Sequence, residues 1–393
     1  MRSAATIPAK VEAEPVPGVY LDGFATAPIA PEARAALIAA LDMPANPSSP
    51  HLLGERAADI IDRAQRDVAG LVGCGAAELT FTSGATEANN IALVGGARAA
   101  LRTTGRRRVV VSAVEHRSVL EPAGFLSGLG FEVVIAPVDA GGRLDLRELG
   151  RLVDDSCWLV SVMAVNNETG VVQPVAEVAA LARDSGALVH TDVAQALGKI
   201  SVNLEDWDVD YASLSGHKVY GPVGIGALYV AAGAPAPEPL QLGGGQQAGR
   251  RPGTEPVALI AGFGAAALVA KQRLDEDAAA AGRRTKLFLD EITRRQVRWR
   301  RTSGDTATVP GALSLRIDGC DGEDIATRLQ NSVFISTGSA CSSGQMTTSH
   351  VLSAMGLDHE QSSSVVRMML GRYLTDDDVF RAAELFSAAV IST

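Results

Sequence analysis

The sequence YASLSGHKVYGP at residues 211–222 joins an apolar run of strand length to a short loop that carries Lys218. The residues GPVGIGALYV (221–230) then lead through a Gly-rich turn into another apolar run, so the loop lies between two predicted strands. A nucleophilic lysine needs such a fixed place and partial desolvation, so that its amine is available uncharged. By itself, a solvated surface lysine is the commoner interpretation. The other lysines lie in a tail, a turn or helix-like polar faces: Lys10, Lys199, Lys271 and Lys286.

Outward from this loop, apolar runs alternate with turns and helix-like patterns from Glu78 to Tyr229. The clearest runs are LTF (79–81), VVVSAV (109–114), WLVSVMAV (158–165), ALVHT (187–191) and YASLS (211–215). This alternation predicts a parallel sheet in an α/β fold. Ligands of an open α/β sheet bind beyond the carboxyl ends of its strands. We therefore expect the residues that follow these runs to meet in one cleft: Thr86, His116, Asn167, Asp192 and Lys218.

The C-terminal part of the chain has a different pattern. LGGGQQAGRRPGTEP (242–256) breaks the alternation and precedes a long Ala-rich segment, 257–288, which is typical of a helix interrupted by glycine. Short strands are predicted at SLRI (314–317), VFIS (333–336) and VVRMML (365–370), followed by a helix that begins with the capping pattern at 375–378. Because 393 residues exceed what one core usually holds, we expect a boundary near Gly262 and a smaller α+β domain after it.

Composition narrows the class of protein. The chain is 47% hydrophobic and 20% charged, as in ordinary globular proteins, and its formal net charge is -10. Because phosphate backbones are bound mainly by Lys and Arg, the acidic balance argues against nucleic-acid binding. The opening stretch MRSAATIPAKVEAEPVPG is interrupted by Lys, Glu and Pro, which indicates neither a secretory signal nor a membrane anchor. We expect a cytoplasmic protein without membrane contact.

The cysteines have the pattern of independent thiols. Cys74, Cys157, Cys320 and Cys341 show no CxxC spacing, which fits a reducing compartment, and no metal site is predicted. Cys157 beside Trp158 and Cys74 are interpreted as buried apolar thiols, and the two acids flanking Cys320 disfavour its thiolate. Cys341 stands alone in the small, polar run TGSACSSG (337–344) after a strand, which is the setting of a nucleophile.

Two segments have groups that suit a ligand with a phosphate group and a ring nitrogen. FTSGATE (81–87) runs from a strand through small residues into a helix, where free backbone donors would suit phosphate, and Ser215 and His217 add side-chain donors. The plain alternative is a tight strand-to-helix connection. Asp192 ends the run 187–191, where a carboxylate can hydrogen-bond a protonated ring nitrogen, and Gln195 follows three residues on. Alone, such an Asp is more often a helix cap.

His116 follows the run 109–114 at the same edge of the sheet. An imidazole there can stack on a flat ring and move protons near neutral pH, although most lone histidines do neither.

These residues resemble the group I cysteine desulfurases, pyridoxal-phosphate enzymes of the class V aminotransferase family that supply sulfur to iron-sulfur cluster assembly and other thiolation pathways. The resemblance extends from Tyr20 to the last helix. Its motifs, in order, are NPSSPH (46–51), FTSGATE (81–87), VEHRSV (114–119), NNETG (166–170), HTDVAQ (190–195), SGHKVYGP (215–222), RPGTE (251–255) and TGSACSS (337–343).

The resemblance implies a fold and a division of the chain. The fold is that of type I pyridoxal-phosphate-dependent transferases: a large domain with a mainly parallel seven-stranded sheet and a smaller α+β domain. Residues 1–18 would form a flexible extension, 19–262 the large cofactor-binding domain, whose first residues pack on the small domain, and 263–393 the small domain with the cysteine loop.

The resemblance also implies roles for single residues. Lys218 forms the Schiff base with pyridoxal 5'-phosphate, Asp192 contacts the pyridine nitrogen, Gln195 the phenolic oxygen, and His116 stacks on the ring. The other cofactor contacts are Ala85, Thr86, Asn167, Ser215 and His217, with Thr254 reaching the phosphate from the second subunit of a homodimer. Arg367, Asn167 and Asn46 bind the substrate, for whose carboxylate a guanidinium is well suited.

The implied reaction converts L-cysteine to L-alanine. Lys218 takes the α-proton, Cys341 receives the sulfur as a persulfide, His116 donates a proton, and an acceptor protein of unknown identity takes the sulfur. The family commonly has a small, hydroxyl-rich sequence where this chain reads Gly23–Ala27, so turnover and substrate preference are open. Two alternatives stay open as well: a selenocysteine lyase or related enzyme of the family that does not need Cys341, and a catalytically weak partner-binding protein that keeps the cofactor.

Overall fold

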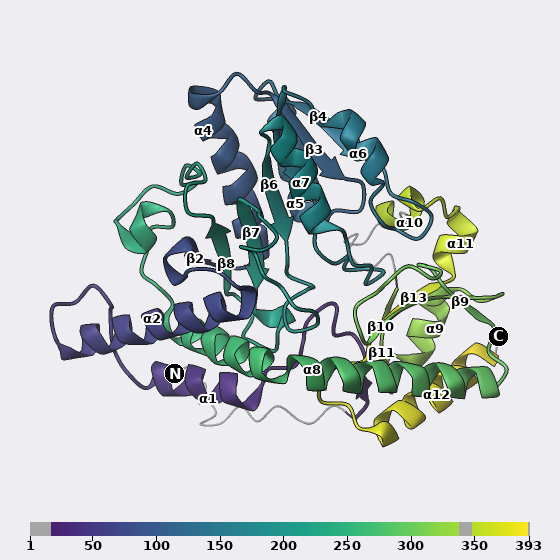
Figure 1. The fold of residues 1–393 in the computed structure, drawn as a ribbon. Helices are drawn as coiled ribbons and strands as arrows, with labels where there is room; N and C mark the ends of the chain where they lie inside the picture. Colours follow the sequence, from purple (N-terminus) through teal and green to yellow (C-terminus); the bar gives the residue numbers. More distant parts are fainter. Residues whose placement is uncertain (1–16, 338–347, 392–393) are drawn as a thin grey trace, which may run out of the picture.

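A computed structural model of the chain describes residues 17–337 and 348–391 (Figure 1). Its central element is a seven-stranded sheet with the order β2-β8-β7-β6-β5-β3-β4. Only β8 runs antiparallel to its neighbours, which confirms the mainly parallel α/β sheet. The strands are β2 (Leu79–Thr82), β3 (Arg108–Ser112), β4 (Glu132–Ala136), β5 (Cys157–Ser161), β6 (Leu188–Asp192), β7 (Tyr211–Ser215) and β8 (Gly226–Val230).

Helices pack on both faces of this sheet. One face is covered by the continuous run α3 (Ala85–Asn90), η2 (Ile91–Gly95) and α4 (Gly96–Thr103), together with α5 (Arg117–Ser127). The other face packs against α2 (Leu52–Val72), α7 (Val175–Ser185) and the first half of α8 (Val257–Arg294). Apolar side chains of every buried strand point to one of these two layers. The remaining helices of this part are α1 (Pro31–Leu41) and α6 (Leu146–Leu152).

The smaller part of the molecule holds an antiparallel sheet of order β12-β13-β10-β9. Its strands are β9 (Trp299–Arg301), β10 (Ala312–Ile317), β12 (Ser336–Thr337) and β13 (Val365–Met369), and its helices are α9 (Gly322–Leu329), α10 (His350–Ala354), α11 (His359–Ser363) and α12 (Asp376–Ile391). The predicted cap of α12 is present: Asp378 N donates to Thr375 Oγ1 at 3.1 Å, and Thr375 N donates to Asp378 Oδ2 at 2.9 Å.

The segment VFIS differs from the prediction of one strand. Val333–Phe334 form β11, which pairs in parallel with β1 (Val19–Tyr20), whereas Ser336–Thr337 belong to β12 of the four-stranded sheet. Ile335 lies between the two ladders, so the chain changes sheets there. The start of the described chain is therefore paired with the smaller part of the molecule, while most of the extension 1–18 lies outside the described residues.

Helix α8 is continuous, so the predicted interruption by glycine is wrong. Gly264 lies where α8 crosses α2, and a Cβ there would come within 2.5 Å of Ala64 Cα. The glycine thus allows close helix packing instead of ending the helix. Figure 1 shows α8 running from beneath the large sheet to α12. Its length and apolar composition would suffice to cross a membrane, but Phe263 and Phe288 lie in the two cores.

Candidate active site

A cavity of about 640 Å³ lies at the carboxyl ends of the large-sheet strands. It is lined by the turn after β2, by His116 before α5, by the segments after β5 and β6, and by the loop after β7. From the smaller part of the molecule it receives Ser336 and Arg367. The structure thus brings together most of the predicted site residues: Ala85, Thr86, His116, Asn167, Asp192, Gln195, Ser215, His217, Lys218 and Arg367.

Asp192 ends β6 and is buried at the cavity wall. Its Oδ2 accepts a hydrogen bond from Asn89 Nδ2 at 2.8 Å, and its Oδ1 accepts one from Ala194 N at 2.9 Å. Donors from two directions fix the carboxylate in place. A fixed carboxylate in a buried wall suits a protonated ring nitrogen, since the charge of each compensates the burial of the other.

Lys218 follows β7 in the short 3-10 turn η3 (Gly216–Lys218). Its Nζ donates to Phe24 O at 2.6 Å and to Ala25 O at 2.7 Å. The segment Gly23–Ala27 therefore binds the lysine amine through two backbone carbonyls. The ring of Phe24 is buried in the core, with the Arg367 guanidinium 5.7 Å from its centroid.

His116 is the N-cap residue of α5. Its Nδ1 accepts from Ser118 N at 3.1 Å and contacts Ser118 Oγ at 2.7 Å, which leaves Nε2 as the nitrogen that can exchange a proton with a ligand. Burial lowers the pKa of His116 below its ordinary value, and the nearby Asp192 carboxylate partly offsets this. At neutral pH the ring is therefore mainly uncharged.

The turn after β2 forms the opposite end of the cavity. Ser83 N donates to Glu87 Oε2 at 2.5 Å, and Arg251 Nε donates to Glu87 Oε1 at 3.2 Å, so the turn is connected to the loop that carries Thr254. His217 contacts Thr26 Oγ1 through Nδ1 at 3.1 Å. Burial, with Lys218 and Lys199 nearby, lowers the pKa of His217 to about 4, so the neutral ring has one N–H to donate.

Arg367 on β13 is buried with 3% of its surface exposed, yet it lines the cavity. Its Nη2 donates to Asp22 Oδ1 at 3.1 Å and its Nη1 to Asn167 O at 3.2 Å. A guanidinium held in this way presents a planar pair of N–H groups, which favours a carboxylate ligand.

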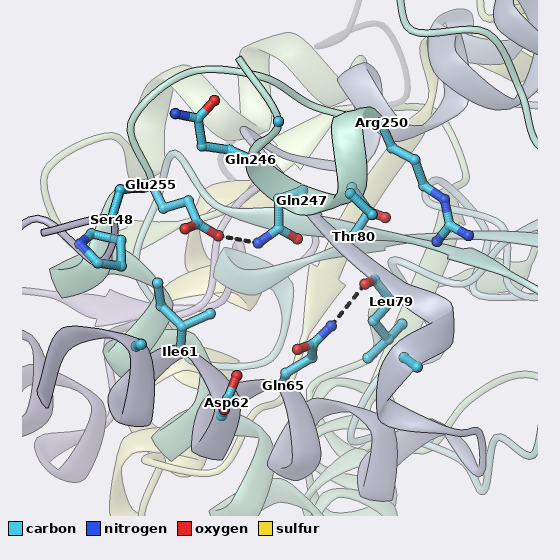
Figure 2. A pocket seen from close by; sticks show the side chains of 15 residues that line it. Ser48, Ile61, Asp62, Gln65, Leu79, Thr80, Gln246, Gln247, Arg250 and Glu255 are labelled. Atoms are coloured by element: carbon cyan, nitrogen blue, oxygen red, sulfur yellow. Dashed lines mark hydrogen bonds between the residues drawn. The ribbon is translucent and has the colours of Figure 1, made fainter. Parts of the chain in front are cut away.

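Two predicted residues, Asn46 and Thr254, do not line this cavity in the single chain. Both are exposed, and the Asn46 side chain accepts a hydrogen bond from Ser48 N at 2.9 Å. Their chain neighbours Pro47, Ser48 and Glu255 line a separate pocket of about 520 Å³. Figure 2 shows this pocket, with Gln247 directed at Glu255 and Gln65 at the Leu79 carbonyl. The two residues that miss the cavity thus flank the same second pocket.

The predicted nucleophile Cys341 lies outside the described residues. Burial raises the pKa of Cys74 to about 12 and that of Cys157 to about 11, so both thiols stay protonated at neutral pH. Cys157 is buried, as predicted, whereas Cys74 is only partly buried.

The cavity fits pyridoxal phosphate by its set of donors and acceptors. It offers an amine at Lys218, a buried carboxylate at Asp192, an imidazole at His116, and hydroxyl and imidazole groups at Ser215 and His217. These are the groups that an aldehyde, a pyridine nitrogen, a ring face and a phosphate require. The described residues hold no group of His, Cys, Asp and Glu that could bind a metal ion.

Sequence reasoning missed several residues around the site. Asn89, Ser118 and Asp22 orient Asp192, His116 and Arg367, respectively. Lys199 lies in a turn, as predicted, and its side chain contacts Gln195 Oε1 and the Lys218 backbone oxygen. Asn89 follows Ala85 by one helical turn, and this spacing was a usable signal, because residues so spaced share a helix face. The sequence carried no comparable signal for Asp22, whose partner Arg367 is 345 residues away.

Comparison with known proteins agrees with this geometry. Residues 19–381 match the pattern of the family described as Aminotransferase class-V. The chain is 39% identical over 369 residues to the mitochondrial cysteine desulfurase of Drosophila melanogaster, covering 93% of this chain and 79% of that protein. A solved structure of a NifS-like protein superposes with a TM-score of 0.88 at 32% identity, covering 96% of this chain and all of that one. SspA in complex with cysteine superposes with a TM-score of 0.79 at 33% identity, covering 91% of this chain and all of SspA.

Proposed function

Because this chain belongs to the aminotransferase class-V family, and within it to the cysteine desulfurases, we propose that it converts L-cysteine to L-alanine and passes the sulfur through Cys341 to an acceptor. The observation that carries the proposal is the convergence of Lys218, Asp192 and Arg367 on one cavity. These residues supply an amine, a buried carboxylate and a buried guanidinium, which the reaction needs at the cofactor aldehyde, the ring nitrogen and the substrate carboxylate.

Residues of the cavity would hold the cofactor along its whole length. Asp192 keeps the ring nitrogen protonated, Gln195 donates to the phenolic oxygen, and Thr86, Ser215 and His217 receive the phosphate. Pyridoxal phosphate, when bound, serves as the electron sink for cleavage at the substrate carbons. Phe24 and Ala25 line the cavity, and their backbone carbonyls accept hydrogen bonds from Lys218 Nζ. These bonds hold the lysine amine at the edge of the cavity.

The protein's own residues then orient the substrate and move protons. Arg367 binds the substrate carboxylate with Asn167 beside it. Lys218 Nζ removes the Cα proton, and the Cys341 thiolate attacks the substrate sulfur, forming an S–S bond while the Cβ–S bond breaks. The electron pair of that bond is protonated at Cβ by the imidazolium form of His116 through Nε2, Lys218 Nζ returns its proton to Cα, and alanine leaves.

The direct test is incubation of the purified, cofactor-loaded protein with L-cysteine. We expect stoichiometric alanine and a mass increase of one sulfur atom on Cys341 by peptide mass spectrometry. Cys341→Ser should abolish the persulfide and sulfide release while keeping the visible absorbance of the cofactor. Lys218→Ala should lose alanine formation and the imine absorbance. Full sulfur release by Cys341→Ser would favour a selenocysteine-lyase-type reaction, and absence of alanine from the wild type would reject an active desulfurase.

The proposed enzyme is a homodimer in which Thr254 enters the partner's cavity. Three observations support this: Thr254 is exposed, it misses the cavity of its own chain, and its loop is tied to the phosphate turn through Arg251 and Glu87. Mixing an inactive Lys218→Ala chain with a Thr254→Ala chain should produce heterodimers with one restored site. Sedimentation as a monomer, or no recovery on mixing, would contradict shared sites.

The acceptor is proposed to serve iron-sulfur cluster assembly or another thiolation pathway. The net charge of -10 favours encounter with basic acceptor surfaces. Purified acceptor candidates can be tested by gel analysis of radiolabelled sulfur leaving Cys341. A transfer rate that falls with added salt is expected for such an encounter.

A further inference from the structure

Lys199 follows β6 and the segment that carries Gln195, and its Nζ reaches toward Lys218. The Nζ atom donates to the Lys218 backbone oxygen at 3.2 Å and to Gln195 Oε1 at 3.5 Å. Together with Lys218, it lines a third, smaller cavity of about 220 Å³, which adjoins the site cavity at Lys218. Lys199 itself does not line the site cavity and contacts it only through Lys218 and Gln195.

The contacts of Gln195 decide which end of its amide faces the site. Oε1 accepts from Lys199, and Nε2 donates to Phe24 O at 2.9 Å. A flipped amide would place its NH₂ against the amine of Lys199 and its oxygen against a carbonyl, which loses both hydrogen bonds. The observed orientation leaves the second N–H of Gln195 for the cavity. A donor there suits an anionic oxygen on the ligand, whereas an acceptor would repel it.

The Lys199 amine is buried, and its pKa differs from that of a solvated lysine. Burial lowers the pKa of Lys199 to about 7, and the charge of Lys218 adds to this effect. The charge of Lys199 contributes to the lowered pKa of His217, which also lines the cavity. In either charge state the Lys199 amine keeps N–H groups to donate to Gln195 and Lys218.

We propose that Lys199 is a positioning residue for the cofactor site: it orients the Gln195 amide so that an N–H faces the phenolic oxygen, and it holds the backbone of Lys218. This inference rests on the proposed function, because it concerns how the same site receives pyridoxal phosphate. Lys199 acts through Gln195 and Lys218 and does not itself contact the reacting atoms.

The test compares binding of pyridoxal phosphate to the cofactor-free forms of matched variants, followed by visible absorbance. Lys199→Met removes the donor at similar length, and Lys199→Gln keeps a donor without the charge. Lys286→Met is the control, because that side chain is 78% exposed and pairs with Asp290 on α8. We expect Lys199→Met to weaken cofactor binding about tenfold and to shift the absorbance maximum, as loss of one to two hydrogen bonds implies. Lys199→Gln should recover most of the affinity.

Coupling to Gln195 separates positioning from a general loss of stability. In a Gln195→Leu background, Lys199→Met should weaken cofactor binding by much less than in the wild type, since the group it orients is already absent. Equal binding and an unchanged spectrum for Lys199→Met, or additive losses in the double variant, would overturn the proposal. If the wild type itself binds no pyridoxal phosphate, it is the proposed function that fails, so the two failures are distinguishable.

Discussion

At the scale of single residues, the polar side chains behind the cavity form defined hydrogen bonds, as do those that line it. His190 on β6 is fully buried, with Nδ1 2.8 Å from Ser161 Oγ and Nε2 3.1 Å from Ser213 Oγ. Serines on both neighbouring strands can satisfy a neutral imidazole, since each hydroxyl donates or accepts as needed. Behind the site, the buried side chains of His190, Ser161 and Ser213 thus form an uncharged hydrogen-bonded group.

The buried, uncharged His190 predicts that the free energy of unfolding decreases at acidic pH. Burial lowers the pKa of His190 to about 4 from an ordinary value of 6.5, although Asp192 partly opposes the shift. Because the folded state holds the neutral form, the stabilisation is complete above pH 6.5 and is lost as the pH falls toward 4. The free energy of unfolding lost between neutral pH and pH 4 is about 3 kcal/mol. Urea unfolding at pH 7 and pH 4.5 should therefore show a smaller loss for His190→Gln than for the wild type; equal losses would contradict the argument.

Arg367 provides a second prediction at this scale. Arg367→Lys keeps the charge but loses the planar pair of donors, so the KM for cysteine should rise about 10- to 100-fold with a smaller change in kcat. Arg300→Lys, on β9 of the same sheet with 70% of its side chain exposed, is the control and should change neither value. Steady-state kinetics with alanine detection decides the matter. An unchanged KM would remove Arg367 from substrate binding.

At the scale of elements, the glycines of α8 show that one residue type serves opposite needs in one helix. Gly264 lies against the backbone of α2, whereas Gly282 is exposed and a Cβ there would meet no atom within 4 Å. The effect of Gly264 on stability therefore depends on helix packing, whereas that of Gly282 depends on helix propensity alone.

The two glycines should therefore respond oppositely to the same change. Gly264→Ala is expected to destabilise the protein by about 1–3 kcal/mol, because the helices must separate to admit the methyl group. Gly282→Ala should stabilise it by about 0.5–1 kcal/mol through reduced chain entropy in the unfolded state. Both values follow from denaturant unfolding monitored by circular dichroism. Stabilisation by both substitutions would mean that the α2–α8 crossing is looser than the structure has it.

At the scale of the whole molecule, α8 joins the two cores. Phe263, Ala267 and Ala270 pack in the large core, and Phe288 and Ile292 pack in the small one. The small core also receives Val19 and Leu21 from the other end of the chain. The boundary near Gly262 that the sequence suggests stays a proposal, and a chain division there would fall inside the helix.

Insertion of a short Gly-Ser linker tests how strongly α8 couples the two parts. After Gly262 the linker lies in the helix interior, where each inserted Gly costs about 1 kcal/mol, so three or more should cost about 3 kcal/mol or more. The same linker after Gly233, an exposed turn residue, only lengthens a loop and should cost less than about 1 kcal/mol. Thermal unfolding by calorimetry measures both. Equal small costs would indicate that the two parts fold without help from a continuous α8.

The sequence by itself determined the parallel α/β sheet and the order of the motifs. It also determined that Lys218, Asp192 and His116 lie at or just beyond strand ends at one edge, because strand alternation and turn signals are local properties of the chain. Only the tertiary structure decided what surrounds those residues. Asp22 meets Arg367, Lys199 reaches Gln195 and Lys218, and Asn46 and Thr254 stay outside the cavity. Such contacts depend on how distant segments pack, and the spacing of residues along the chain does not encode them.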